Sequence, residues 1–143
     1  IAVSRKTRSG EISSFGGLFL YAPGLAVMMT IFLASLAGIP PLGGWYAKFG
    51  AFRAVIDAGG GWGYSIAVIG AVNAVIATAY YIMVMREMWM KPVPDGDVTP
   101  IKVQPPVMAA LAITGICVVL FGVLPGLVSK FGDLSDLAGA FGR

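Results

Sequence analysis

The chain has 143 residues, of which 57% are hydrophobic and 12% are charged, and its formal net charge at pH 7 is +3. A soluble domain normally carries about 25% charged residues, so this chain has too few charges to cover a folded surface in water. Composition and charge therefore argue against a soluble enzyme, a disordered linker, a coiled coil and a nucleic-acid-binding domain, and they predict an integral membrane protein whose partner is the lipid bilayer.

The chain contains one cysteine and no histidine. By itself it cannot form a disulfide, a His or multi-Cys metal site, a haem site or an iron–sulfur cluster, so we expect any redox cofactor to be held by other chains. The sequence opens at Ile1 with a polar, basic stretch that lacks the pattern of a signal peptide. We expect it to be the C-terminal part of a longer protein.

Residues 1–22 are expected to form a cytoplasmic lead whose basic residues are Arg5, Lys6 and Arg8. Within this lead, Phe15, Leu18 and Phe19 have the spacing of one helical face. The stretch is therefore a candidate interfacial helix that would lie flat on the membrane before Pro23.

Residues 23–57 are the first candidate crossing of the membrane. As one continuous helix they would be about 50 Å long, well beyond the hydrocarbon core of about 30 Å. Five residues that favour a helix break lie in the middle of this range: Gly38, Pro40, Pro41, Gly43 and Gly44. Two separate crossings would also account for the length, but the second would be short and would place Lys48 and Arg53 in lipid. A single broken crossing is the preferred interpretation.

Residues 62–89 are the second candidate crossing. Trp62 and Tyr64 stand at one end and Trp89 at the other, as expected of aromatic anchors at the two membrane interfaces. The glycine cluster at residues 59–63 is interpreted as a turn. It contains no GxGxxG or P-loop pattern and follows no predicted strand, so nucleotide binding is not supported.

Residues 105–125 are the third candidate crossing, after a cytoplasmic loop at residues 90–104. Pro105 and Pro106 suit the start of a helix, and Pro125 suits its end. Cys117, between two apolar residues, is interpreted as a small apolar filler. The expected fold is thus all-α, with three crossings of which one is broken.

The distribution of Lys and Arg predicts the orientation of these crossings. Three basic residues precede the first crossing, and three more lie near the loop before the last: Arg86, Lys91 and Lys102. A single broken first crossing places both groups in the cytoplasm, where basic residues accumulate. The tail at residues 126–143, with Lys130 and Arg143, is then expected outside.

Lys48 is the strongest candidate for a functional residue. A lysine inside a neutral run costs about 2.5–3.5 kcal/mol at the bilayer centre unless it faces protein, water or an opposite charge. Loss of water destabilises the charged form of an ammonium group, so a lysine in such a place is suited to accept and release a proton. The alternative is a side chain that reaches the headgroups along its apolar stem. Arg53 and Asp57 lie nearer the end of the segment. For them, a side chain that extends to the headgroups or a surface ion pair is the preferred interpretation.

The predicted break is a second candidate feature. Backbone groups freed at mid-membrane are tolerated only where they are buried in protein or line a watery cavity. Discontinuous helices with a polar residue beside the break recur in transporters, where the ends of the half-helices line ion pathways. The alternative is a proline kink that only shapes packing.

A thin polar stripe is predicted on the second crossing, where Ser65, Asn73 and Tyr80 fall on one side of the helix. Such groups are able to hold water, although bonding between helices is the commoner use. Tyr81 points in another direction and is expected to pack.

The run LAGIPPLGGWYAKF at residues 36–49 resembles the broken-helix motif of the antiporter-like membrane subunits of proton-pumping NADH:quinone oxidoreductase, respiratory complex I. Lys48 followed by Phe49 is most similar to the subunit N branch, since the subunit M branch tends to carry a glutamate at the lysine position. The similarity continues through residues 73–81 and to residues 124–126. Trp45 and Ala47 depart from the Phe and Gly that are more common in the motif.

The resemblance implies the C-terminal helices of a longer antiporter-like subunit in a bacterial plasma membrane. Lys48 would match the family's lysine in the broken helix and would relay protons toward the outer face. NADH, FMN, iron–sulfur clusters and quinone would be bound by other subunits. The partners would be the upstream part of the same subunit and the other membrane subunits of complex I.

Two alternatives remain open at this point. One is a subunit of a multisubunit cation/proton antiporter or of a membrane-bound hydrogenase, which share the broken-helix layout. The other is a purely structural membrane subunit, in which the break supports packing and Lys48 tolerates replacement by methionine.

Overall fold

A computed structural model describes residues 10–126 of the chain. Its elements are the 3-10 helix η1(Ile12–Phe15) and the α-helices α2(Leu18–Tyr21), α3(Pro23–Ala37), α4(Gly43–Asp57), α5(Gly60–Met90) and α6(Pro105–Val123). The described part is helical and contains no strand, so the predicted all-α membrane fold with one broken helix is confirmed. Several residues used to predict orientation lie outside the described residues: Arg5, Lys6, Arg8, Lys130 and Arg143.

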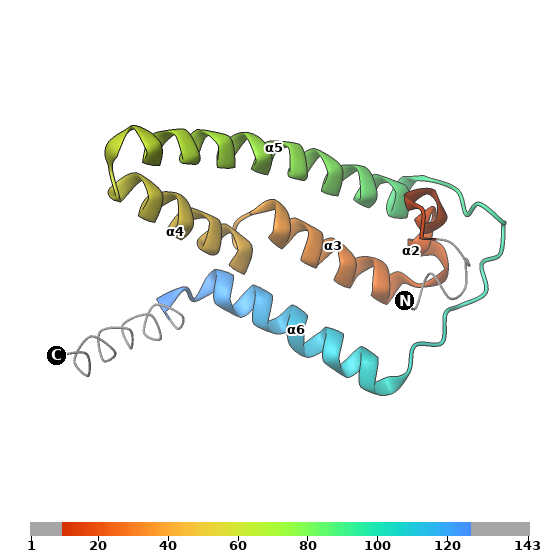
Figure 1. Cartoon of the computed structure of the whole chain (residues 1–143). Helices are drawn as coiled ribbons and strands as arrows, with labels where there is room; N and C mark the ends of the chain where they lie inside the picture. Colours follow the sequence, from red (N-terminus) through yellow and green to blue (C-terminus); the bar gives the residue numbers. More distant parts are fainter. Residues whose placement is uncertain (1–9, 127–143) are drawn as a thin grey trace.

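The helices form three rows, with the broken pair α3 and α4 in the middle (Figure 1). The returning helix α5 has 31 residues, about 46 Å, and contacts both halves of the pair. The opposite row is α6, which also contacts both α3 and α4. Each half of the pair has 15 residues, about 22 Å, so neither half alone spans a hydrocarbon core of about 30 Å.

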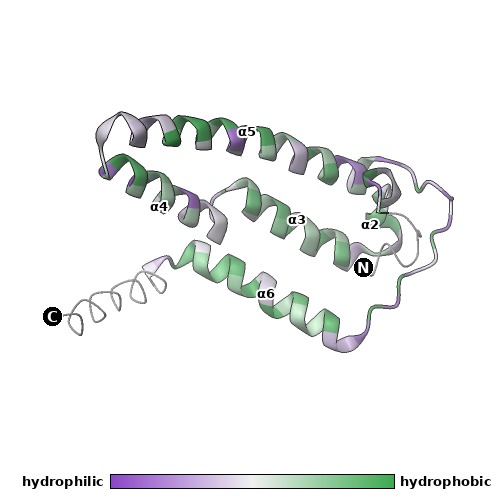
Figure 2. Cartoon of the chain, in the orientation of Figure 1, coloured by the Kyte–Doolittle hydropathy of each residue, from purple (hydrophilic) through white to green (hydrophobic). Residues whose placement is uncertain are grey.

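The apolar surface agrees with a chain that lies in a membrane. α5 and α6 are both long and apolar enough to cross a bilayer, whereas α3 is apolar but shorter. Figure 2 shows hydrophobic colour along all the main helices, with hydrophilic colour in the loop between α5 and α6, at helix ends and at isolated places within α4 and α5.

The turn between α4 and α5 is shorter than the sequence predicted. α5 begins at Gly60, so the interpretation of residues 59–63 as a turn is wrong for most of that range. Gly63 is instead a packing residue inside the helix, because a Cβ there would lie 2.7 Å from the carbonyl oxygen of Val55 on α4. The close approach of the two helices, rather than a bend, accounts for this glycine.

A row of small residues on α5 faces the broken pair. Its members recur every three or four residues, and each is buried or half-buried: Gly63, Ala67, Gly70, Ala74 and Ala77. At Gly70 a Cβ would lie 3.1 Å from the ring of Phe52. Small residues at such spacing let helices in a membrane approach closely. The row therefore fixes α5 against both α3 and α4.

The N-terminal stretch packs on the protein at the far end of the bundle. Leu18 and Met88 are fully buried there, and the N–H of Gly17 donates to the carbonyl oxygen of Glu87 at 3.2 Å. Burial also raises the pKa of Tyr21, which keeps its phenol neutral. The face that held Phe15, Leu18 and Phe19 is thus partly covered by the bundle and is not a free apolar face.

Trp89 links this end of α5 to its neighbours. Its ring stacks on Phe19 with centroids 4.5 Å apart, and its Nε1–H donates to the Thr30 hydroxyl oxygen at 2.9 Å. Trp62, at the other end of α5, is 84% exposed. The two tryptophans expected as interfacial anchors therefore have different surroundings.

Replacing Trp89 by phenylalanine keeps an aromatic ring for stacking and removes the hydrogen bond to Thr30. We expect the free energy of unfolding in detergent to fall by about 0.5–1.5 kcal/mol. Far-UV circular dichroism during chemical unfolding measures the change. Trp62→Phe is the matched control and should leave stability unchanged; an equal loss in both variants would contradict a specific role for the Thr30 bond.

Candidate functional site

The interruption between α3 and α4 begins with a glycine in the left-handed conformation. Gly38 has a φ of 86°, and its N–H bonds to the carbonyl oxygens of Ala34 at 3.1 Å and Ser35 at 2.9 Å. An L-residue with a side chain rarely adopts this φ, which explains why α3 ends at a glycine. Pro40 and Pro41 follow and have no N–H groups with which to continue the helix.

The start of α4 takes a polar partner from the preceding helix. The N-cap residue, Leu42, has no side-chain group that accepts a hydrogen bond, and the first turn contains no acidic residue. The hydroxyl oxygen of Ser35 instead accepts a hydrogen bond from the N–H of Gly44 at 3.0 Å. Ser35 thus supplies to α4 what an N-cap side chain normally supplies.

Lys48 supplies the reciprocal contact from α4 to the end of α3. Its Nζ donates to the carbonyl oxygen of Ala37, the last residue of α3, at 3.1 Å. The C-terminal end of a helix carries partial negative charge, so an ammonium group there is stabilised by roughly 0.3–2 kcal/mol. Among residues 10–126 no carboxylate lies within ion-pair distance of Lys48. Its partner in the described structure is therefore a helix end.

Gly44 allows the two half-helices to come this close. A Cβ on Gly44 would overlap the backbone of Ser35, so any side chain would push α4 away from α3. The apolar stem of Lys48 lies over Gly38, where an added Cβ would be 3.1 Å from Lys48 Cδ. Two of the three glycines of the predicted break therefore have defined roles here: Gly38 turns the chain, and Gly44 allows close packing.

The end of α6 covers the opposite side of the break. A Cβ on Gly122 would overlap the backbone of Pro41 and Leu42, and one on Gly43 would lie 3.3 Å from the carbonyl oxygen of Val118. Beside this contact lies an open groove of about 480 Å³ between α4 and α6. Its lining residues are Ser35, Gly43, Gly44, Tyr46, Ala47, Gly50, Ala51, Val118 and Phe121.

The structure brings together Lys48 and the five residues of the predicted break, and it adds two residues that the sequence reasoning missed. Ser35 is a polar residue within the apolar α3, three positions before Gly38. A polar residue so close to the break is the feature of the sequence that could have identified it. Gly122 gave no local signal, because its role depends on the approach of α6 to the break. The relay role of Lys48 stays a prediction.

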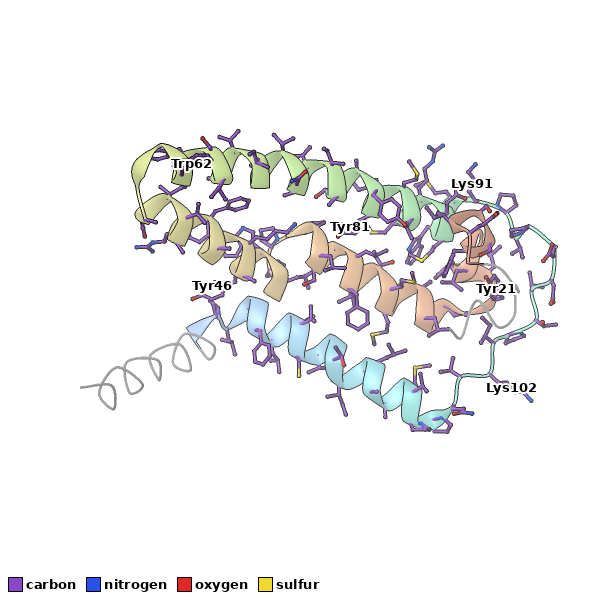
Figure 3. All side chains as sticks on the ribbon, viewed as in Figure 1. Tyr21, Tyr46, Trp62, Tyr81, Lys91 and Lys102 are labelled. Carbon is purple, nitrogen blue, oxygen red and sulfur yellow. The ribbon has the colours of Figure 1, made fainter. Side chains whose placement is uncertain are left out.

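The polar stripe on α5 lies apart from the break. Ser65, Asn73 and Tyr80 are all exposed, and the Ser65 hydroxyl donates to the carbonyl oxygen of Gly61 within its own helix at 2.8 Å. Tyr81 lies on the side of α5 that faces α3 (Figure 3). The stripe is therefore directed away from the broken pair, and its use stays a prediction.

The remaining candidates have ordinary surroundings. Arg53 and Asp57 form an exposed ion pair with 3.5 Å between Nε and Oδ2, which confirms the surface-pair interpretation. Cys117 is a free, half-buried thiol on α6. In the described part of the chain, no three His, Cys, Asp or Glu side chains gather in a group suited to a metal ion.

Comparison with known proteins adds a family to this geometry. A family model described as "NADH:quinone oxidoreductase/Mrp antiporter, TM" matches residues 1–76, the part that contains the break. The chain is similar to NADH-quinone oxidoreductase subunit N of Dehalococcoides mccartyi, with 39% identity over 125 residues, 87% of this chain and 25% of the relative. It is 35% identical over 131 residues to subunit N 1 of Chloroherpeton thalassium, covering 92% of this chain and 26% of the relative.

A solved structure supports the same relationship. A chain of respiratory complex I from Thermus thermophilus with bound aureothin aligns with a TM-score of 0.68 and 28% identity, over 82% of this chain and 26% of that chain. These matches confirm the resemblance predicted from the broken-helix motif. This chain spans about a quarter of the length of the relatives that it matches.

Replacing Gly44 by alanine should separate the two half-helices, because the added methyl group has no space against Ser35. We expect a loss of about 1–3 kcal/mol in the free energy of unfolding in detergent. The matched control is Gly50→Ala on the same helix, where no atom lies within 4 Å of the added Cβ. Thermal unfolding of both variants measures the difference, and equal stabilities would contradict the close packing at Gly44.

Proposed function

The chain belongs to the NADH:quinone oxidoreductase/Mrp antiporter transmembrane family, and from this premise we propose that it is the C-terminal part of an antiporter-like subunit of bacterial complex I. In this role it contributes to proton translocation across the plasma membrane while NADH reduces quinone elsewhere in the complex. Support comes from relatives described as subunit N and from a structural neighbour described as respiratory complex I.

The observation that carries the proposal is the position of Lys48 at the break. Its Nζ lies 3.1 Å from the Ala37 carbonyl oxygen, at a helix end in the middle of an apolar bundle. The carbonyl oxygen accepts one N–H of Lys48 and holds the side chain at the end of α3. In the proposed relay, this contact is the resting position of Lys48.

The break also supports a water-accessible path. Backbone groups that no longer follow a helix survive within a membrane only where protein or water satisfies them. The groove between α4 and α6 opens on Ser35 and on the first turn of α4, one helical turn from Lys48. We propose that water reaches the break through this groove.

The proposal assigns the redox reaction to other chains. NADH, FMN, iron–sulfur clusters and quinone would be bound by other subunits of the complex. The proposed partners of this chain are the upstream part of the same subunit, other membrane subunits of complex I, and lipid. The exposed stripe on α5, with Asn73 near its middle, is suited to face one of these protein partners rather than lipid.

A structural role for Lys48 is the competing function, and the Ala37 hydrogen bond is the observation that favours it. A lysine that caps a helix end stabilises the break without moving a proton. The two roles differ in their consequence for pumping, because only a relay requires a group that titrates.

Replacement of Lys48 by methionine in the assembled complex separates these roles. Methionine keeps an unbranched apolar stem and has no proton to transfer, so we expect NADH-driven proton pumping to fall by about two-fold or more. The rate of dye quenching in membrane vesicles reports pumping, and a native gel stained for NADH oxidation reports assembly.

Lys102→Met is the matched control for loss of a lysine. Lys102 is exposed in the loop between α5 and α6, far from the break (Figure 3). This variant should assemble and pump normally. A fully assembled Lys48→Met complex that pumps like the wild type would overturn the relay role and support the structural one.

A further inference from the structure

We propose that Ser35 is a positioning residue for Lys48. Its hydroxyl group holds the first turn of α4 against the end of α3, and this places the Lys48 ammonium group at the Ala37 carbonyl oxygen. The inference rests on the relay role proposed above for Lys48.

The first step is the contact that Ser35 makes. Its hydroxyl oxygen accepts the N–H of Gly44 at 3.0 Å, across the break and from a different helix. Because Leu42 provides no side-chain cap, the Ser35 hydroxyl takes the place of one at the first turn of α4. A hydrogen bond at this place restrains both the position of α4 along its axis and its rotation relative to α3.

The second step is the register of α4. Gly44 and Lys48 are four residues apart, so they lie on the same face of the helix, one turn from each other. Both face the end of α3: Gly44 contacts Ser35, and Lys48 contacts Ala37 and Gly38. A shift of α4 at Gly44 is therefore transmitted directly to the ammonium group.

An open groove beside the Ser35–Gly44 contact leaves space for such a shift. The groove of about 480 Å³ is lined by both Ser35 and Gly44, so the contact lies at the edge of an open volume. Without an acceptor on residue 35, the N–H of Gly44 has no bond to α3, and the first turn of α4 has one restraint fewer at the edge of this volume. The Lys48–Ala37 distance of 3.1 Å would then lengthen, which weakens a hydrogen bond steeply.

The matched pair of variants is Ser35→Thr and Ser35→Val. The two side chains have nearly the same shape, and only threonine retains the hydroxyl oxygen that accepts the Gly44 N–H. Both are introduced into the complete complex in membrane vesicles, together with Lys48→Met and the double variant Ser35→Val/Lys48→Met. Assembly, NADH oxidation and NADH-driven proton pumping are measured for each.

We expect Ser35→Val to lose about half or more of the pumping that Lys48→Met loses, with normal assembly, and Ser35→Thr to retain pumping near the wild-type rate. In the double variant the valine should cause no further loss, because Ser35 acts through Lys48. The control for loss of a hydroxyl is Thr114→Val on α6, whose hydroxyl bonds only within its own helix and which should pump normally.

The outcomes separate the two proposals. If Lys48→Met pumps normally, the relay role itself is overturned. If Lys48→Met is defective but Ser35→Val pumps like the wild type, only the positioning role is overturned. A Ser35→Thr complex that pumps no better than Ser35→Val, or a further loss in the double variant, would likewise show that Ser35 does not act by holding Lys48.

Discussion

The structure depends on how the polar groups of an interrupted helix are satisfied inside an apolar bundle. At the break, α3 leaves carbonyl oxygens and α4 leaves N–H groups without the partners that a continuous helix would provide. Two reciprocal bonds answer this need: Ser35 on α3 accepts the Gly44 N–H, and Lys48 on α4 donates to the Ala37 carbonyl. Each half-helix thus completes the other, and the break is a defined junction rather than a flexible kink.

The other helices are arranged to hold this junction. α5 is long enough to contact both halves, and its row of small residues brings it close to them. α6 meets the opposite side, where Gly122 leaves room for the backbone of Pro41 and Leu42. Because neither half-helix spans a hydrocarbon core alone, the continuous helices on both sides keep the two halves in line (Figure 1).

Lys48 combines a structural contact with a chemical capacity. As a cap, it places positive charge at the negative end of α3, where the helix dipole favours it. Among the described residues no carboxylate lies within ion-pair distance of its ammonium group, so the end of α3 is its partner. The same hydrogen bond that stabilises the break fixes the position of the Lys48 ammonium group relative to the two half-helices. In the proposed relay, this link is how Ser35, which has no titratable group, would act on proton transfer.

The sequence by itself determined the class of protein, the approximate place of the helices and the break, and it singled out Lys48 as a candidate. These features follow from composition, from runs of apolar residues and from prolines and glycines, whose effects on the backbone are local. Only the tertiary structure decided which groups meet across the break, that Gly63 is a packing residue rather than part of a turn, and that Gly122 and Ser35 belong to the site. Those roles depend on the approach of helices that are distant in the chain or separated by the break, and the local pattern does not encode such distances. The polar stripe on α5 is another example. Helical periodicity predicted that Ser65, Asn73 and Tyr80 lie on one side of the helix. Only the packing of the helices showed that this side faces away from α3 and α4.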